Sequence, residues 1–127
     1  MGAQKKLVIV AGAGAGLGQS ILARFAGGGY TCVGLGRSAP DTQIGEFHKI
    51  DLDDAVKVPV TISNIIAEHG PPRVVVHNTS ELVIAPFRDT GLEGFQRTWA
   101  STVQTAILVA KSTLDPMADA GGGTFIV

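Results

Sequence analysis

The chain has 127 residues, a formal net charge of −1, 45% hydrophobic residues and 17% charged residues. This length predicts one domain over residues 1–127, and the apolar composition excludes intrinsic disorder. The near-zero net charge lacks the clustered basic face of a nucleic-acid-binding protein, and no run of about 18 apolar residues indicates a membrane span. The single cysteine, Cys32, excludes an internal disulfide and favours a cytoplasmic location.

The first half of the chain predicts strands on either side of a helix. Residues 7–11 form a short apolar run rich in β-branched side chains, which is typical of a strand buried on both faces. A glycine-rich loop follows, and apolar residues then recur at helical spacing, at Leu17, Ile21, Leu22 and Phe25. A second buried strand is predicted at 31–35 and a weaker strand at 47–50.

The second half of the chain repeats this alternation. Before a Gly-Pro-Pro break at 70–72, apolar residues recur at helical spacing, at Val58, Ile62, Ile65 and Ile66. A strand is predicted at 74–77, and the longest helix is predicted from 92 to 114. This helix should end before Asp115, because the residue that precedes a proline disfavours the helical conformation. A last strand is predicted at 124–127.

Strands that alternate with helices favour parallel strands joined by right-handed crossovers. We therefore predict an α/β fold, a doubly wound, Rossmann-like parallel sheet of five strands with helices on both faces. The chain stops within an apolar strand, whereas natural C-termini tend to be polar and exposed. From this ending we expect a domain that lacks its last strands and leaves a sheet edge unpaired.

A glycine-rich loop joins the first strand to the first helix. Glycines let the backbone turn sharply and approach a pyrophosphate, and the helix N-terminus presents free N–H groups to it. The spacing is G-x-x-x-G-x-G, and no G-K-[ST] follows as in nucleoside triphosphatases. A purely structural strand–helix turn is the alternative. We expect this loop to bind a nucleotide through Gly12, Gly14, Ala15, Gly16, Leu17 and Gly18.

The end of the second strand indicates which nucleotide binds. Sites that prefer NAD place an acidic residue there, which binds the ribose 2′-hydroxyl. This chain has Gly36, Arg37 and Ser38 instead. Because a guanidinium binds phosphate in a bidentate way, Arg37 and Ser38 favour the 2′-phosphate of NADP. The alternative is a solvated arginine in a loop.

Together these positions resemble the short-chain dehydrogenase/reductase family over essentially the whole chain. The glycine loop is similar to the family's T-G-x-x-x-G-x-G pattern, with Ala11 in place of threonine, and Arg37 matches its NADP-type arginine. Residues 74–80 are similar to the family's fourth strand and its N-N-A-G motif, of which Asn78 is retained. The resemblance implies further cofactor-binding residues at Asp51, Leu52, Asn78, Thr79 and Ser80.

The resemblance also shows which catalytic groups the sequence lacks. The family's active site uses an asparagine on the long helix, a serine, and a Tyr-x-x-x-Lys pair whose lysine lowers the pKa of the tyrosine. The asparagine position falls on Thr102, and the serine would follow the last strand. The only tyrosine, Tyr30, has Gly34 four residues on. We therefore assign no catalytic residue and expect no hydride transfer from this chain alone.

Histidines and carboxylates offer no replacement for these groups. We expect His48 at the surface or on an edge strand, and His69 as a charge at a helix C-terminus. His77 replaces the first asparagine of the motif, where packing or hydrogen bonding is the expected role. The acidic residues between 51 and 54 are explained by turn formation after a strand, so we expect no metal site.

Three functions are consistent with the sequence. In the first, the chain is the N-terminal, NADP(H)-binding part of a short-chain dehydrogenase/reductase-like oxidoreductase. In the second, it is a non-catalytic sensor module that binds NADP(H). In the third, it is a degenerate subunit that pairs with an intact relative through the long helix between Trp99 and Leu114. The resemblance also implies a homodimer through this helix, and the apolar ending favours the first function.

Overall fold

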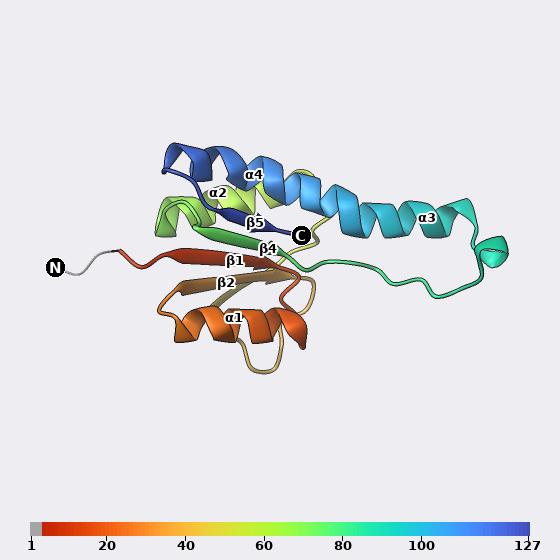
Figure 1. The fold of residues 1–127 in the computed structure, drawn as a ribbon, viewed down its shortest axis with the longest axis horizontal. Coiled ribbons are helices and arrows are strands. Elements are labelled where there is room, and N and C mark those ends of the chain that lie inside the picture. Colours follow the sequence, from red (N-terminus) through yellow and green to blue (C-terminus); the bar gives the residue numbers. More distant parts are fainter. Residues whose placement is uncertain (1–3) are drawn as a thin grey trace.

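The computed structural model describes residues 4–127, which form an α/β fold around one sheet (Figure 1). The sheet is parallel throughout, with the strand order β3-β2-β1-β4-β5. Its strands are β1 (Leu7–Ala11), β2 (Thr31–Gly36), β3 (Glu46–Lys49), β4 (Val74–His77) and β5 (Thr124–Ile126). The predicted Rossmann-like sheet is therefore confirmed, and the bounds of each strand agree with the prediction to within one residue.

Helices cover both faces of the sheet, as predicted (Figure 1). On one face lies α1 (Leu17–Gly27), and on the other lie α2 (Lys57–His69) and α4 (Thr105–Asp119). A 3₁₀ turn at Phe87–Asp89 precedes α3 (Leu92–Trp99), which projects past the carboxyl ends of the strands. Within residues 4–127, no helix has the length and apolar character needed to traverse a lipid bilayer.

The central strand β1 is buried along its whole length, which explains its unbroken apolar sequence. Its neighbours on either side are β2 and β4, so that Ile9 is in register with both Val33 and Val75. Successive side chains point to opposite faces. Ile9 belongs to the core cluster formed with α2 and α4, whereas Val8 and Val10 belong to the cluster formed with α1.

The long helix differs from its prediction. We predicted one helix over 92–114, but a five-residue π-helical segment separates α3 from α4, and α4 continues past Pro116 to Asp119. The prediction that the helix ends before the proline is therefore wrong. A proline inside a helix removes one N–H donor and crowds the preceding turn. Here the last turn is held because Met117 is buried in the core and its carbonyl accepts the Gly122 N–H.

Candidate functional site

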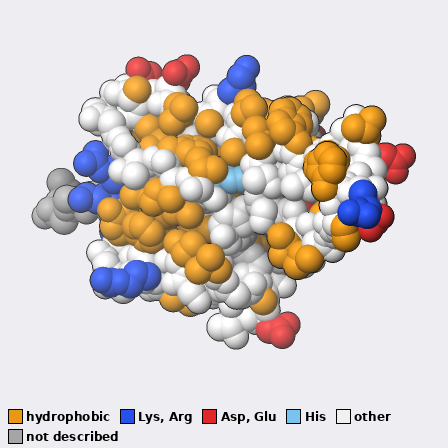
Figure 2. All heavy atoms as spheres, turned by 45° about the vertical axis from the view of Figure 1, so that its right-hand side comes forward, with side chains coloured by type: hydrophobic (Ala, Val, Ile, Leu, Met, Phe, Trp, Pro, Cys, Tyr) orange, Lys and Arg blue, Asp and Glu red, His pale blue; other side chains and the backbone are white. Residues whose placement is uncertain are grey.

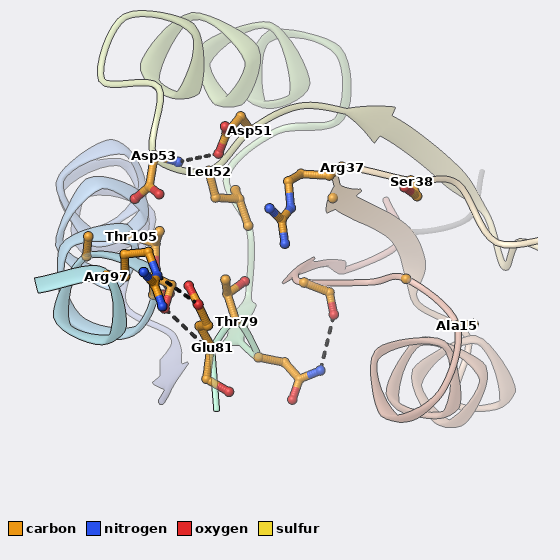
Figure 3. A pocket seen from close by; sticks show the side chains of 17 residues that line it. Ala15, Arg37, Ser38, Asp51, Leu52, Asp53, Thr79, Glu81, Arg97 and Thr105 are labelled. Carbon is orange, nitrogen blue, oxygen red and sulfur yellow. Dashed lines mark hydrogen bonds and ion pairs between the residues drawn. The ribbon is translucent and has the colours of Figure 1, made fainter. Parts of the chain in front are cut away.

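An open cleft with a volume of about 880 Å³ lies at the carboxyl ends of the strands (Figure 3). In open α/β sheets, ligands bind where the strand order reverses, which here is between β1 and β4. Most of the residues that we predicted to bind a cofactor line this cleft, namely Gly12, Gly14, Ala15, Arg37, Ser38, Asp51, Leu52, Asn78, Thr79 and Ser80.

The three other predicted residues lie beside the cleft and not in its lining. Gly16 is the N-cap of α1, with a φ of 101° that favours glycine, and Leu17 is exposed. Gly18 is buried, and a Cβ atom there would lie 2.7 Å from the Cα atom of Ala13. Gly16 therefore allows the turn into α1, and Gly18 allows the helix to start close to the end of β1.

Gly12 lies where the loops after β1 and β4 meet. Its φ is 90°, and a Cβ atom there would lie 2.7 Å from Oγ1 of Thr79 and closer still to the carbonyl of Asn78. Asn78 fixes this approach, because its Nδ2 donates to the Gly12 carbonyl at 3.1 Å and its N–H donates to the Ala11 carbonyl at 2.7 Å. The retained asparagine of the motif thus holds the glycine loop in place.

The start of α1 leaves room for an anion. A Cβ atom at Gly14 would come no closer than 3.9 Å to another group, and one at Gly16 would meet nothing within 4 Å. Among the described residues, α1 has no side-chain cap and no acidic residue in its first turn. Its first N–H groups and the positive end of its dipole are therefore available to a phosphate.

Arg37 and Ser38 follow the end of β2 and line the same cleft. In Figure 3 the guanidinium of Arg37 points into the space between the strand ends. Within residues 4–127, Arg37 takes part in no ion pair. Two backbone hydrogen bonds connect the glycine loop to the end of β2, because the N–H groups of Gly12 and Ala13 both donate to the Leu35 carbonyl.

The acidic residues after β3 form turns, as the sequence indicated. Oδ1 of Asp51 accepts the N–H of Asp53 at 3.1 Å. Oδ1 of Asp54 accepts the N–H groups of Lys57 and Val56 at 2.9 and 3.0 Å. These backbone donors hold the pKa of Asp54 below its ordinary value. Asp51 and Asp53 border the cleft, whereas Asp54 caps the first turn of α2.

His77 has a hydrogen-bonding role at the end of β4. It is buried, and its Nε2 lies 2.8 Å from Oγ1 of Thr105. The Thr105 hydroxyl donates its proton to the Ser101 carbonyl at 2.7 Å, so it accepts from Nε2–H of His77. Burial lowers the pKa of His77, which favours the neutral ring, and the hydrogen bond to Thr105 places its proton on Nε2.

Several residues of the cleft have no signal in the sequence. Arg97 of α3 donates from Nε to Glu81 at 3.1 Å, and Ser101 accepts the N–H of Glu81 at 3.0 Å. Only the spacing of Ser101 and Thr105, four residues apart on one helix, could have suggested a shared face. Thr102, which the resemblance placed at the family's asparagine position, lies in the π-helical segment and is not part of the lining.

One polar atom in this cleft lacks a partner. Among the described residues, Oγ1 of Thr79 is buried and forms no hydrogen bond. Such groups are uncommon, because leaving a buried hydroxyl unpaired costs about 1–3 kcal/mol. Since Thr79 lines the cleft and touches the glycine loop, a polar ligand group there would satisfy it.

Comparison with known proteins identifies the family. Residues 6–127 match the model of the short chain dehydrogenase family. The chain belongs to this family. A short chain dehydrogenase/reductase, dmxR12, from Cryptosporiopsis sp. (strain 8999) is 35% identical over 74 residues, which cover 57% of this chain and 30% of that protein.

Solved structures of short-chain dehydrogenases share the fold. One from Streptomyces avermitilis has a TM-score of 0.88 at 22% identity and covers 98% of this chain and 48% of its own. One from Leptospira borgpetersenii with bound NAD+ has a TM-score of 0.85 at 16% identity and covers 96% of this chain and 50% of its own. The chain thus spans about half the length of these family members.

Proposed function

We propose that this chain is the NADP(H)-binding part of a short-chain dehydrogenase/reductase-like oxidoreductase. The observation that carries the proposal is Arg37, whose guanidinium enters the cleft at the end of β2, beside Gly36 at the position where a site for NAD has an acidic residue. A guanidinium can bind the 2′-phosphate through two parallel hydrogen bonds, and the adjacent Ser38 adds a hydroxyl donor. The cytoplasmic location predicted from the lone Cys32 belongs to this proposal.

The residues of the cleft fit such a cofactor. The glycine loop would take the pyrophosphate at the start of α1, and Asp51 with Leu52 would border the adenine. The nicotinamide half would lie along residues 78–80, where the Thr79 hydroxyl gains a partner. When bound, a nicotinamide cofactor supplies or accepts a hydride. The protein's own contribution is to orient the cofactor and to exclude water from it.

The test is the preference between two cofactors. Titration of the chain with NADPH and NADH, followed by nicotinamide fluorescence, should give a dissociation constant for NADPH that is at least ~10-fold lower. Arg37→Asp should abolish this preference, because it removes the guanidinium and places a carboxylate that repels the 2′-phosphate. Arg24→Asp, at the far end of α1, is the matched control and should leave both constants unchanged. Equal constants in the wild type would rule the proposal out.

We also propose that the chain alone transfers no hydride. Its 127 residues contain no Tyr-x-x-x-Lys motif. His77 is the buried titratable group nearest the cleft, but its Nε2–H is donated to Thr105 and its pKa is lowered by burial. Loss of NADPH absorbance with a panel of carbonyl substrates, catalysed by contaminant-free protein and dependent on its concentration, would contradict this proposal.

Self-association through the long helix is the last part of the proposal. Trp99, Val103 and Ile107 follow one another at helical spacing and are each 41–52% exposed. Leu114 extends this stripe toward the end of α4. Hydrophobic side chains gather in broad areas of the face seen in Figure 2. A stripe of this kind supports packing against a second copy or an intact relative.

A further inference from the structure

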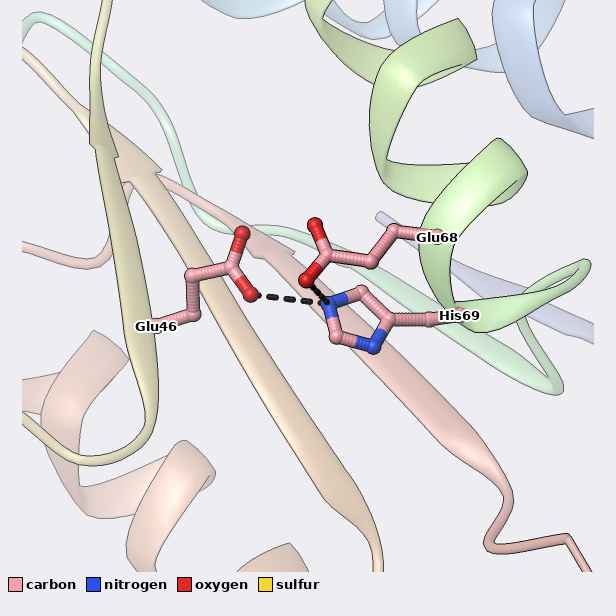
Figure 4. A group of neighbouring side chains, drawn as sticks. All are labelled: Glu46, Glu68 and His69. Carbon is pink, nitrogen blue, oxygen red and sulfur yellow. Dashed lines mark hydrogen bonds and ion pairs between the residues drawn. The ribbon is translucent and has the colours of Figure 1, made fainter.

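A cluster of histidine and glutamate side chains lies at the end of the sheet away from the cofactor cleft (Figure 4). Glu46 is the first residue of β3, and His69 is the last residue of α2. Because β3 runs parallel to its neighbours, its first residue lies opposite the carboxyl ends that form the cleft. None of these side chains lines that cleft, so the cluster is separate from the proposed cofactor site.

The carboxylate of Glu46 is shared by two imidazoles. Oε1 lies 2.5 Å from Nε2 of His48, and Oε2 lies 2.7 Å from Nε2 of His69. Glu46 and His48 are two residues apart on a strand, so their side chains point to the same face of the sheet. Glu68 adds a second carboxylate, with Oε1 at 3.8 Å from Nε2 of His69. Three of these residues, Glu46, Glu68 and His69, therefore bring ligand atoms together from two elements, and His48 lies beside them as a hydrogen-bond partner of Glu46.

The framework around these side chains is fixed. Gly70 ends α2 by donating its N–H to the Ile66 carbonyl, and Nε2 of Gln4 donates to the His69 carbonyl at 3.0 Å. The side chain of His69 is only 20% exposed, and those of Glu46 and His48 are 33% exposed. The three groups are thus held in a partly desolvated position, and Glu68 remains at the surface.

One imidazole nitrogen with two carboxylate oxygens forms a three-ligand set that suits a Zn²⁺ ion with water in the fourth position. The ligand atoms of Glu46, Glu68 and His69 all lie within 4.8 Å of one another, which a four-coordinate ion can span. The two carboxylates balance the charge of a divalent cation. An ion between them would replace the proton that Nε2 of His69 shares with Glu46, since a ligating histidine is deprotonated at that nitrogen.

We propose that Glu46, Glu68 and His69 bind one Zn²⁺ ion, with water as the fourth ligand. The ion would join the edge strand β3 to the end of α2, two elements that the Glu46–His69 hydrogen bond already connects. Its role is to stabilise this edge, because an ion that binds only the folded chain adds its binding free energy to folding.

The first measurement is the affinity of the chain for Zn²⁺ itself. Tag-free protein is stripped with a chelator and then titrated with Zn²⁺ in competition with a chromophoric chelator. We expect one ion per chain with a dissociation constant of ~1 μM or below. Co²⁺ should give the intense visible bands of a four-coordinate site. A wild-type chain that binds no stoichiometric Zn²⁺ overturns the proposal.

Three substitutions locate the site. Glu46→Gln, Glu68→Gln and His69→Gln should each weaken Zn²⁺ binding at least ~10-fold, because each removes one ligand. Glu93→Gln on α3 is the matched control and should change the affinity by less than about twofold. Zn²⁺ should also raise the melting temperature of the wild type and of Glu93→Gln, but not that of Glu46→Gln.

The variants keep the proposal testable even if one of them misfolds. Glu68→Gln lies on an exposed part of α2, where the side chain is 67% exposed, and is the variant least dependent on packing. Circular dichroism without metal establishes that each variant has the wild-type helix content. Wild-type Zn²⁺ affinity in the folded Glu68→Gln and His69→Gln variants would show that the ion binds elsewhere, and would overturn the assignment to this cluster.

Discussion

His77 connects the end of β4 to the start of α4 through its hydrogen bond to Thr105. Burial lowers the pKa of His77, so the folded chain binds a proton there more weakly than the unfolded chain does. Where the unfolded state binds more protons, stability rises with pH. The contribution of the neutral ring is therefore complete above the ordinary histidine pKa of 6.5 and is lost as the pH falls through and below that value.

Replacing this histidine should make the stability of the fold depend less on pH in the acidic range. His77→Asn removes the titrating group but keeps a side chain that can donate a hydrogen bond. We expect the melting temperature of this variant, followed by circular dichroism, to vary less between about pH 5 and pH 7 than that of the wild type. Thr105→Val retains the buried ring and should retain the wild-type slope. Identical slopes in His77→Asn and the wild type would contradict the assignment.

Individual residues were predictable where the backbone geometry restricts the residue type. The glycine pattern identified Gly12, whose φ and close approach to Thr79 exclude a side chain. Arg37 followed from its position at the end of a recognisable strand. Glu81 and Arg97 were not predictable, because their ion pair depends on how a loop returns to a helix. Such a tertiary contact has no periodicity in the sequence.

At the scale of the elements, the last turn of α4 depends on one side chain. Met117 is only 3% exposed. A Cβ atom added at Gly123 would lie 2.6 Å from the Cε atom of Met117. Met117 therefore packs beneath the connection from α4 to β5. This burial offsets the missing N–H of Pro116. It explains why the helix continues past the end that we predicted from the sequence.

Shortening this side chain should destabilise the fold. Met117→Ala should lower the free energy of unfolding by about 2–4 kcal/mol, because it removes buried methylene groups and leaves a cavity. Leu114→Ala, on the same helix but 47% exposed, should cost less than about 1 kcal/mol. Urea unfolding followed by circular dichroism measures both. Similar losses in the two variants would show that Met117 does not anchor the turn.

The strands were the most predictable elements and the long helix the least. The central strands β1 and β4 are apolar except for His77 at the end of β4, because helices cover both faces of the sheet, and this pattern is visible in the sequence. The π-helical segment between α3 and α4 leaves no such pattern, because residues 100–104 read as ordinary helix. The position of Thr102 relative to the cleft was unpredictable for the same reason.

At the scale of the whole molecule, the exposed apolar stripe of the long helix should govern self-association. Ile107 lies near its middle and is 45% exposed. Ile107→Glu would place a charge in any interface built on this stripe, and a buried unpaired charge is strongly destabilising. We expect light scattering at micromolar concentrations to give a mass above that of one chain for the wild type and the mass of one chain for Ile107→Glu.

The matched control for this measurement is Val60→Glu. Val60 lies on α2 outside the stripe and is 57% exposed, so a charge there should leave the mass of the wild type unchanged. A monomeric wild type, or a Val60→Glu variant that dissociates as readily as Ile107→Glu, would argue against an interface along the long helix.

The central place of β1 has a consequence for how the chain folds during synthesis. β1 precedes every other strand of the sheet, yet one of its two sides pairs with β4, far along the sequence. As the chain leaves the ribosome, β1 and β2 can pair early, whereas the second edge of β1 stays open until β4 emerges. Such distant parallel pairing forms slowly, and an open apolar edge invites intermolecular pairing. The interval between the emergence of β2 and that of β4 is therefore the stage at which the nascent chain most needs a chaperone.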